Sequence, residues 1–587
     1  MNTIFSKLNK QDVLSVILLF VMFFSMVYSS YSEWGNPVID CFRNAYIPAE
    51  ILNNKLLYKD IYYLYGPAVV YFHAFIFSIF GIKLNVLYAI SIFLNSLIII
   101  SGYILARELL KPLEAFLCIT IFVIQNIFFP SLVQYMFPFA YESVYGALII
   151  ILLLICYLKT IKSEFKTYKY FLTAGILTGI MSLVKQDMAL STYLIFYIFS
   201  GYSLYKNRLK IKTILISLIP VLIPAIIYSL ILLYIPYSDL INGLIPLRFC
   251  FDIRGNIDFS NAVGSFLIPA IFLTIVTAIY YIPISISNKL NHFKRFKTTF
   301  ISLLLLIILL LIFKDTFNYV IYLLFQGKLY QWLIIFYTIY LILLLLKYNK
   351  NNVSMKYTEK GIILLIICCL LLSLRNKLFL ELLFSSNFIF LPYLIVLIYI
   401  IYNEIPALLS KLNVKYYTSA ISSTLITFIL ILSGLYISIY SYPRVKIETD
   451  RGLYLATSAQ GEALSQTINY IINSTKKSDY ILAIPDESIL YFMTGRTSPI
   501  KYYQFIPGMI ENIKEETRCL NKLKENKPSL IIISNSYINK YYNKKEWGID
   551  YDKLIYKWIL KNYKQTKTFG NTTDSNENYA LKIYEPI

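Results

Sequence analysis

The chain has 587 residues, of which 58% are hydrophobic and only 15% are charged. Apolar runs near membrane length recur along it, so a large soluble core is excluded and a polytopic integral membrane protein is predicted. The formal net charge of +21 is spread over short basic clusters between the apolar runs. That pattern orients helices in a bilayer and does not form a nucleic-acid-binding stripe, so no nucleic-acid partner is expected.

The apolar runs predict about thirteen membrane helices, because the bilayer core offers a non-helical backbone no hydrogen-bond partner. Lys7 and Lys10 precede the first run, which lacks a clear small-residue cleavage site, so an uncleaved anchor is expected there. The predicted helices span 12–31, 86–106, 113–130, 138–158, 170–186, 188–205, 213–235, 263–287, 299–313, 331–346, 361–374, 388–402 and 419–441.

The basic clusters predict an orientation in the membrane. With the N-terminus inside and each helix crossing once, lysine and arginine are enriched in the inside loops although the outside loops are longer. The inside clusters lie at 7–10, 107–111, 159–169, 206–212, 289–297, 347–360 and 411–415. An odd number of crossings then predicts a multi-pass cell-membrane protein with a cytoplasmic N-terminus and an extracytoplasmic C-terminal tail.

Residues 442–587 are polar and predict a separate domain. Tyr480–Ile484 and Leu530–Ser534 read as buried strands, and Glu511–Lys524 between them reads as an amphipathic helix. The expected fold class is therefore a polytopic all-α membrane domain, residues 1–441, followed by an extracytoplasmic mixed α/β domain, residues 442–587.

Cysteine and histidine usage argues against disulfide and zinc chemistry. Most of the seven cysteines lie in apolar runs and none forms a C-x-x-C pair, while the chain has only two histidines. No cofactor is assigned. A divalent cation is left open, because the lack of a histidine or dense carboxylate cluster argues only weakly against one.

The first predicted outside loop, residues 32–85, combines charges with residues that restrict the backbone. Pro37, Pro48 and Pro67 constrain it, and Ala49–Leu52 and Tyr58–Tyr65 read as short interfacial helices. The non-functional explanation of these charges is that any outside loop carries some. The functional reading is that Asp40 accepts a proton from an incoming hydroxyl or orients it.

Two further polar positions lie at predicted outer helix ends. Lys185-Gln186-Asp187 interrupts an apolar stretch, and it is read either as a tight turn between two helices or as a cavity wall where Lys185 binds phosphate. Glu142 follows Pro138 at the start of the fourth predicted helix, where an acid favoured by the helix dipole is the simpler explanation.

Arg375 lies beside apolar runs on the predicted outside, against the usual charge bias. Binding a lipid phosphate would explain it, because a guanidinium suits phosphate oxygens. Snorkelling to the interface is the bland alternative. The absence of a glycine-rich phosphate loop, an H-E-x-x-H motif and a G-x-S-x-G elbow argues against a nucleotide-driven pump and against a standard protease or lipase.

The first loop resembles integral-membrane glycosyltransferases of the GT-C superfamily, nearest to the protein O-mannosyltransferase-like and lipid A aminoarabinose-transferase-like proteins. Lys185 and Asp187 are similar to a further family pattern, and 491–508 resembles the outside domain of such enzymes. The resemblance is strongest over 40–81 and weak between 200 and 440. The matching first-loop residues are Asp40, Arg43, Tyr46, Pro48, Ile51-Leu52, Leu57-Tyr58, Asp60 and Tyr65-Gly66-Pro67.

The resemblance implies a reaction and roles. A sugar moves from a polyprenyl-phosphate donor to a hydroxyl of a glycan, lipid or protein acceptor at the outer membrane face, with inversion. Asp40 is the implied catalytic carboxylate, and Arg43, Lys185 and Arg375 are implied to bind the donor phosphate. Residues implied to contact the acceptor or shape the loop are Tyr46, Glu50, Asp60, Tyr65, Glu142 and Asp187.

One departure from the family concerns the position after Asp40. Close relatives often carry two adjacent acids there, whereas this chain has Cys41, so a second acid would come from elsewhere, with Glu142 and Asp187 as candidates. Two alternatives to a glycosyltransferase of this type stay open: a transporter or flippase for lipid-linked sugars, and an O-antigen-type polymerase or ligase.

Overall fold

The computed structural model describes residues 9–37, 40–129, 134–205, 210–245, 328–351, 355–378, 389–411, 418–510, 512–535, 546–571 and 579–587. The chain divides into two compact units, one formed by Met1–Gly255 with Tyr348–Ile587 and the other by Asn256–Lys347. In the second unit the structure describes only the greater part of one helix, α16 (Lys328–Asn351).

Long apolar helices make up most of the first unit, and they lie where the hydropathy pattern predicts them. A helix stands at each predicted position except 263–287 and 299–313, which lie outside the described residues. The helices of this unit are α2 (Lys10–Ser29), α5 (Leu84–Arg107), α6 (Pro112–Phe122) with a π-helical continuation (Val123–Phe128), α7 (Tyr141–Lys162), α8 (Lys169–Val184), α9 (Gln186–Tyr205), α10 (Lys210–Ile231), α11 (Tyr237–Leu244), α17 (Tyr357–Leu378), α18 (Phe390–Tyr399) with its continuation through Ile400–Glu404 into α19 (Ile405–Lys411), and α20 (Thr418–Tyr440).

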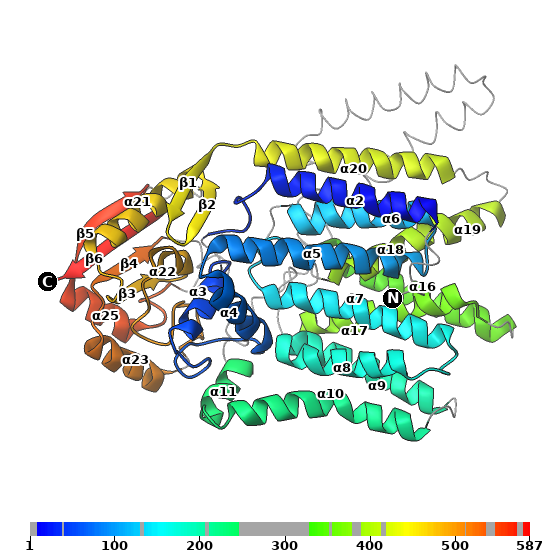
Figure 1. The fold of residues 1–587 in the computed structure, drawn as a ribbon, viewed down its shortest axis with the longest axis horizontal. Helices are drawn as coiled ribbons and strands as arrows, with labels where there is room; N and C mark the ends of the chain where they lie inside the picture. Colours follow the sequence, from blue (N-terminus) through cyan, green and yellow to red (C-terminus); the bar gives the residue numbers. More distant parts are fainter. Residues whose placement is uncertain are drawn as a thin grey trace, which may run out of the picture. The chain divides into compact units, whose positions relative to one another are not determined.

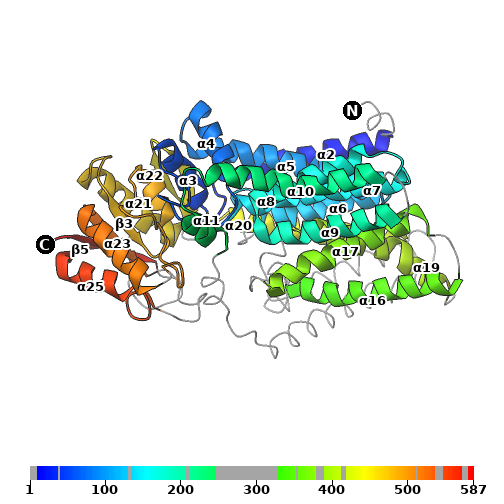
Figure 2. The ribbon, with the colours of Figure 1, turned by 90° about the horizontal axis from the view of Figure 1, so that it is seen from below.

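Within the described residues, five helices are long and apolar enough to cross a membrane: Lys10–Ser29, Leu84–Arg107, Tyr141–Lys162, Ile211–Ile231 and Phe390–Ala407. Several helices of this kind in one chain make it a multi-pass membrane protein. Figures 1 and 2 show α5, α7, α8 and α10 running side by side, with α7 packed against both α5 and α8. Isoleucine and leucine side chains along α10 are exposed, as expected of a face that meets lipid.

Ion pairs join the helices at the end where α5 finishes. Asp12 of α2 accepts hydrogen bonds from Arg107 Nε at 2.5 Å and from the Tyr103 hydroxyl at 2.9 Å. Glu108, directly after α5, pairs with Lys159 and with Lys162 of α7. Asp12 and Glu108 therefore both have cationic partners, as burial of charge requires.

The first loop is partly helical. It contains α3 (Arg43–Leu52), which includes the predicted Ala49–Leu52 helix, and a second apolar helix, α4 (Ala68–Phe80). The predicted helix at Tyr58–Tyr65 is wrong. Asp60 closes a tight turn by accepting the Leu56 amide at 2.9 Å, and Tyr58 has a positive φ of 69°, which a right-handed helix does not allow.

The C-terminal region contains a hairpin and a small sheet. Strands β1 (Arg444–Thr449) and β2 (Gly452–Thr457) pair antiparallel, and the four-stranded sheet has the order β3-β4-β6-β5. The sheet strands are β3 (Ile481–Ile484), β4 (Leu530–Ser534), β5 (Tyr563–Gly570) and β6 (Ala580–Pro586). The helices are α21 (Ser458–Ser474), α22 (Ser488–Thr494), α23 (Ile513–Glu525) and α25 (Lys553–Asn562). Both predicted strands and the predicted amphipathic helix are confirmed.

Backbone hydrogen bonds attach this C-terminal region to the first loop and to the neighbouring helix ends. Tyr62 donates to the Lys501 carbonyl at 2.9 Å, Leu84 donates to Arg451 at 2.7 Å, and Leu455 donates to Ser32 at 2.9 Å. These contacts bring the residues after β3 close to Asp40, although they are more than four hundred positions away in the chain.

Candidate active site

Asp40 lies in the turn that leads into α3. Its φ is +41°, a left-handed conformation that aspartate tolerates better than most residues. Arg43 forms an ion pair with it, with Nη1 3.0 Å from Oδ1, and the two side chains are 4% and 17% exposed for Arg43 and Asp40. No described residue donates a hydrogen bond to Asp40 Oδ2. That oxygen is therefore the one left to meet a substrate.

A second carboxylate comes from the C-terminal region. Asp486 follows β3 directly after Pro485 and is 3% exposed. The side-chain amide of Gln504 donates one hydrogen bond to Asp40 Oδ1 and another to Asp486 Oδ1. The backbone amide of Phe505 donates to the Pro485 carbonyl at 2.7 Å, which holds the Gln504 segment beside Asp486. Burial, together with the negative charge of Asp40, raises the pKa of Asp486 well above its usual value.

Arg43 has partners on three elements. Besides Asp40, its Nη2 donates to the Phe139 carbonyl at 2.7 Å, and its guanidinium lies 5.3 Å from the centre of the Tyr65 ring. Burial on its own would lower the pKa of Arg43, but Asp40, Tyr65, Tyr503 and Glu142 together outweigh it and the pKa is raised. The guanidinium is thus a permanent positive charge beside Asp40.

The Tyr65 ring lies between two cations. Lys185 connects α8 to α9, is 6% exposed, donates to the Ser143 hydroxyl at 2.5 Å, and lies 5.0 Å from the Tyr65 ring centre. Gly66 makes this approach feasible, because a Cβ there would lie 2.2 Å from the Leu183 carbonyl oxygen. Lys185 lies in the turn between α8 and α9, as one of the two readings from the sequence predicts, and its side chain is buried. Phosphate binding, the other reading, stays a prediction.

Glu142 lies in the first turn of α7 and is fully buried. Its Oε1 accepts a hydrogen bond from the Tyr63 hydroxyl, and Oε2 has no hydrogen-bond partner among the described residues. Its negative charge acts on both Arg43 and Tyr65. Glu142 is therefore an acid at the start of a helix, as the simpler explanation predicts, and it also lies close to Arg43 and Tyr65.

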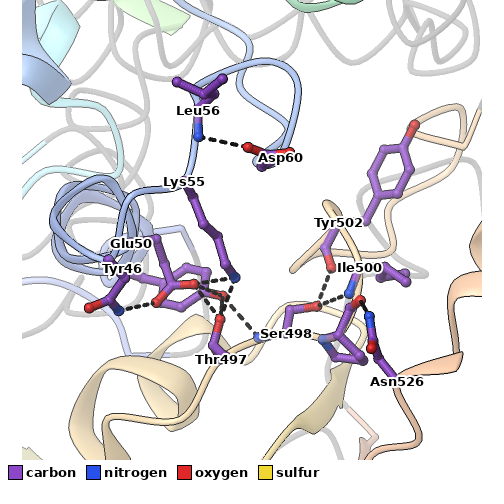
Figure 3. A network of polar contacts seen from close by, with 12 residues as sticks. Tyr46, Glu50, Lys55, Leu56, Asp60, Thr497, Ser498, Ile500, Tyr502 and Asn526 are labelled. Atoms are coloured by element: carbon purple, nitrogen blue, oxygen red, sulfur yellow. Dashed lines mark hydrogen bonds and ion pairs between the residues drawn. The ribbon is translucent and has the colours of Figure 1, made fainter. Parts of the chain in front are cut away.

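Tyr46 and Glu50 join the first loop to the C-terminal region, as Figure 3 shows. The Tyr46 hydroxyl accepts the Ser498 amide at 3.0 Å, and Glu50 contacts Lys55 and Thr497. This network shapes the loop and lies apart from the Asp40 carboxylate. Asp60 is exposed and closes its own turn.

Asp187 and Arg375 complete the set of predicted positions. Asp187 accepts the Met188 amide at 2.9 Å in the first turn of α9, where the helix dipole favours an acid. Arg375 lies near the end of α17, and its side chain is outside what the structure describes. Burial raises the pKa of Cys41 to about 12, so the residue after Asp40 is a neutral thiol.

Part of the chain matches a known protein family. Residues 65–228 match the profile of the family described as dolichyl-phosphate-mannose-protein mannosyltransferase. The match relates this segment of the chain to that mannosyltransferase family. No curated protein sequence matches the chain at a significant level.

Solved structures of other proteins resemble this chain distantly. The Archaeoglobus fulgidus oligosaccharyltransferase is 13% identical in both of its forms. The match to the apo form covers 89% of this chain and 69% of the oligosaccharyltransferase chain, with a TM-score of 0.44. The match to the form tethered to an acceptor peptide covers 97% of this chain and 74% of the oligosaccharyltransferase chain, with a TM-score of 0.47. Apo ArnT from Cupriavidus metallidurans is 12% identical over 97% of both chains, with a TM-score of 0.41. All three TM-scores are below 0.5, so the family match on residues 65–228 supports the assignment.

Sequence reasoning brought Asp40, Arg43, Tyr65, Glu142 and Lys185 forward, and the structure gathers them. It missed Asp486 and Gln504. A signal for Asp486 was present, because an acid directly after a fully apolar strand lies at a sheet edge, where binding groups often gather. In the described part of the chain, no group of three or more histidine, cysteine, aspartate or glutamate side chains is arranged to hold a metal ion.

Proposed function

We propose that this protein transfers a sugar from a polyprenyl-phosphate donor to a hydroxyl of a glycan, lipid or protein acceptor, with inversion at the anomeric carbon. The observation that carries the proposal is the meeting of Asp40 with two buried cations, Arg43 and Lys185, around the Tyr65 ring. The relationship to the mannosyltransferase family over residues 65–228 supports the same reaction class.

Each group has a role in this reaction. The acceptor hydroxyl gives its proton to Asp40 Oδ2, and its oxygen forms the new bond to the anomeric carbon. The bond from that carbon to the phosphate oxygen breaks, and its electron pair leaves with the phosphate. Arg43 and Lys185 stabilise the charge that develops on the phosphate, since preoriented cations in a site shielded from water act strongly. Arg375 stays a candidate for the same task.

The membrane setting completes the proposal. The charge bias of the loops supports a cytoplasmic N-terminus, with the first loop and the C-terminal region on the extracytoplasmic side. The donor lipid then lies in the bilayer beside the helices, with its phosphate at the level of Arg43 and Lys185.

A donor-cleavage assay tests the proposal without knowledge of the acceptor. The full-length protein in proteoliposomes is given a panel of polyprenyl-phosphate hexoses, with water as the acceptor and free hexose as the product. Asp40→Asn is expected to lower cleavage by about 10²- to 10⁴-fold, the range for loss of a general base.

Asp60→Asn is the matched control, because Asp60 is an exposed first-loop acid, and it is expected to leave cleavage unchanged. Wild-type cleavage by Asp40→Asn would contradict the role of Asp40. Movement of the lipid across the bilayer without cleavage of any hexose would contradict the reaction and favour a flippase.

A further inference from the structure

Gln504 connects two carboxylates that come from different parts of the chain. One is Asp40 in the first loop, and the other is Asp486 at the carboxyl end of β3. A side-chain amide carries two N–H donors, and here one nitrogen uses both, one on each carboxylate. The position of the Asp40 carboxylate therefore depends on a group of the C-terminal region.

We propose that Asp486 is a positioning residue for the transfer reaction: through the Gln504 amide it sets the orientation of the Asp40 carboxylate, and it supplies the second acid that the first loop lacks. This inference rests on the proposed function, because it assigns Asp486 to the same reaction. It gives the C-terminal region a direct part in the site.

The surroundings of Asp486 support this role. In the described part of the chain no lysine or arginine forms an ion pair with Asp486, so the Gln504 amide is its side-chain partner. A buried carboxylate without a cation is costly. Burial and the charge of Asp40 raise the pKa of Asp486, which favours its neutral form. A neutral Asp486 holds the amide without adding a second negative charge beside Asp40.

The two acids predicted from the sequence are less suited to this role. Glu142 accepts its hydrogen bond from Tyr63, and Asp187 accepts the Met188 amide in the first turn of α9. The structure gives neither of them a hydrogen bond to Gln504. Asp486 and Asp40 accept hydrogen bonds from the same nitrogen, Gln504 Nε2, so the positions of the two carboxylates are coupled.

Among the described residues, Arg43 and Gln504 donate to the Asp40 carboxylate, and both donate to Oδ1. They hold this oxygen and leave Oδ2 for the acceptor proton. Without Asp486 the Gln504 amide can rotate, and the lone pair on Oδ2 is no longer held toward the acceptor hydroxyl. Because misplacement of a catalytic group slows the chemical step, kcat is expected to fall more than the donor KM changes.

The experiment measures kcat and KM for donor cleavage by the full-length protein in proteoliposomes, with a polyprenyl-phosphate hexose that the wild type cleaves. Asp486→Ala is expected to lower kcat by about 10- to 100-fold, as removal of one partner of a buried hydrogen bond does, with KM within about twofold. Asp486→Asn is expected to recover most of kcat, because its amide oxygen can accept the Gln504 N–H. Asp450→Ala, an exposed acid of the C-terminal region, is the matched control and is expected to match the wild type.

Gln504→Leu provides a second route to the same answer if Asp486→Ala does not fold. It is expected to reproduce the loss in kcat, and the Asp486→Asn,Gln504→Leu double variant should lose no more than Gln504→Leu alone. Wild-type kcat in either Asp486→Ala or Gln504→Leu would overturn the proposal. Equal losses in Asp486→Asn and Asp486→Ala would also overturn it, because charge would then matter rather than position. If Asp40→Asn lowers cleavage while Asp486→Ala keeps the wild-type kcat, the inference alone fails. Full cleavage by Asp40→Asn would instead remove the proposed role of Asp40.

Discussion

Buried carboxylates have different partners at the two ends of the helices that carry the site. At the end where α5 finishes, Asp12 is paired with Arg107, and Glu108 with Lys159 and Lys162. At the end that meets the first loop, Asp40 shares its hydrogen bonds with Arg43 and Gln504, and Asp486 has only an amide. Balanced pairs join helices, whereas an excess of acids beside two cations is a common arrangement at functional sites.

The pKa directions follow the same division. Burial opposes the charged form of Glu108, but hydrogen bonds from Lys159 and Lys162 lower its pKa overall. Burial raises the pKa of Asp486 and that of Glu487, and no cation reverses it. One end is therefore built for stability, and the other accepts an electrostatic cost beside the proposed reaction centre.

The largest expected effect is on the rate at the site end. Lys185→Met is expected to lower donor cleavage by about 10²- to 10³-fold, since it removes a buried cation from the departing phosphate. Lys162→Met at the opposite end is expected to stay within about twofold of the wild type. The readout is hexose release in proteoliposomes. Similar losses in the two variants would contradict the conclusion that only the end with Asp40 takes part in the reaction.

The next effect is on stability at different pH values. Burial raises the pKa of Glu487 from 4.5 to about 7, so the folded protein retains this proton while the unfolded chain releases it. Its contribution, about 3 kcal/mol at most, is present below pH 4.5 and is lost as the pH rises toward 7. Asp486 acts in the same direction. Glu487→Gln is expected to flatten the fall in melting temperature between pH 4.5 and 7 in detergent, and an unchanged slope would contradict the burial of this acid.

Close packing at the first loop should have a smaller effect. Gly66→Ala is expected to destabilise the protein by about 2 kcal/mol and to slow donor cleavage, because the new Cβ meets the Leu183 carbonyl and displaces Tyr65 from Lys185. Gly201→Ala is the matched control, since no atom lies within 4 Å of its Cβ position. Melting temperature and hexose release are measured for both, and equal behaviour would contradict the close approach of the loop to α8.

The smallest effect is expected at the end opposite the site. Glu108→Gln loses charge-assisted hydrogen bonds from Lys159 and Lys162 and is expected to cost about 1.5 kcal/mol of stability. Donor cleavage measured below the melting temperature should stay close to the wild type. A loss of cleavage with unchanged melting temperature would show that Glu108 acts in the reaction and not only in stability.

Local patterns predicted the helices and much of the site well. Apolar runs must be helical in lipid, so their positions could be read from the chain, and the strands Tyr480–Ile484 and Leu530–Ser534 followed from equally local apolar runs. The Tyr58–Tyr65 helix failed because the Asp60 turn, a side-chain hydrogen bond, competes with the helical pattern.

The sequence by itself determined a multi-pass membrane protein with a C-terminal α/β region, because hydropathy and charge bias are properties of neighbouring residues. It also singled out Asp40 as a carboxylate of the first loop and Lys185 as an interruption of an apolar run, while Arg43 came from the family resemblance. Only the tertiary structure decided that both cations face Tyr65 and that Asp486 reaches Asp40 through Gln504. The hydrogen bond from Gln504 to Asp40 spans 464 positions in the chain. No local pattern encodes such a contact, because it depends on how the C-terminal region packs against the first loop.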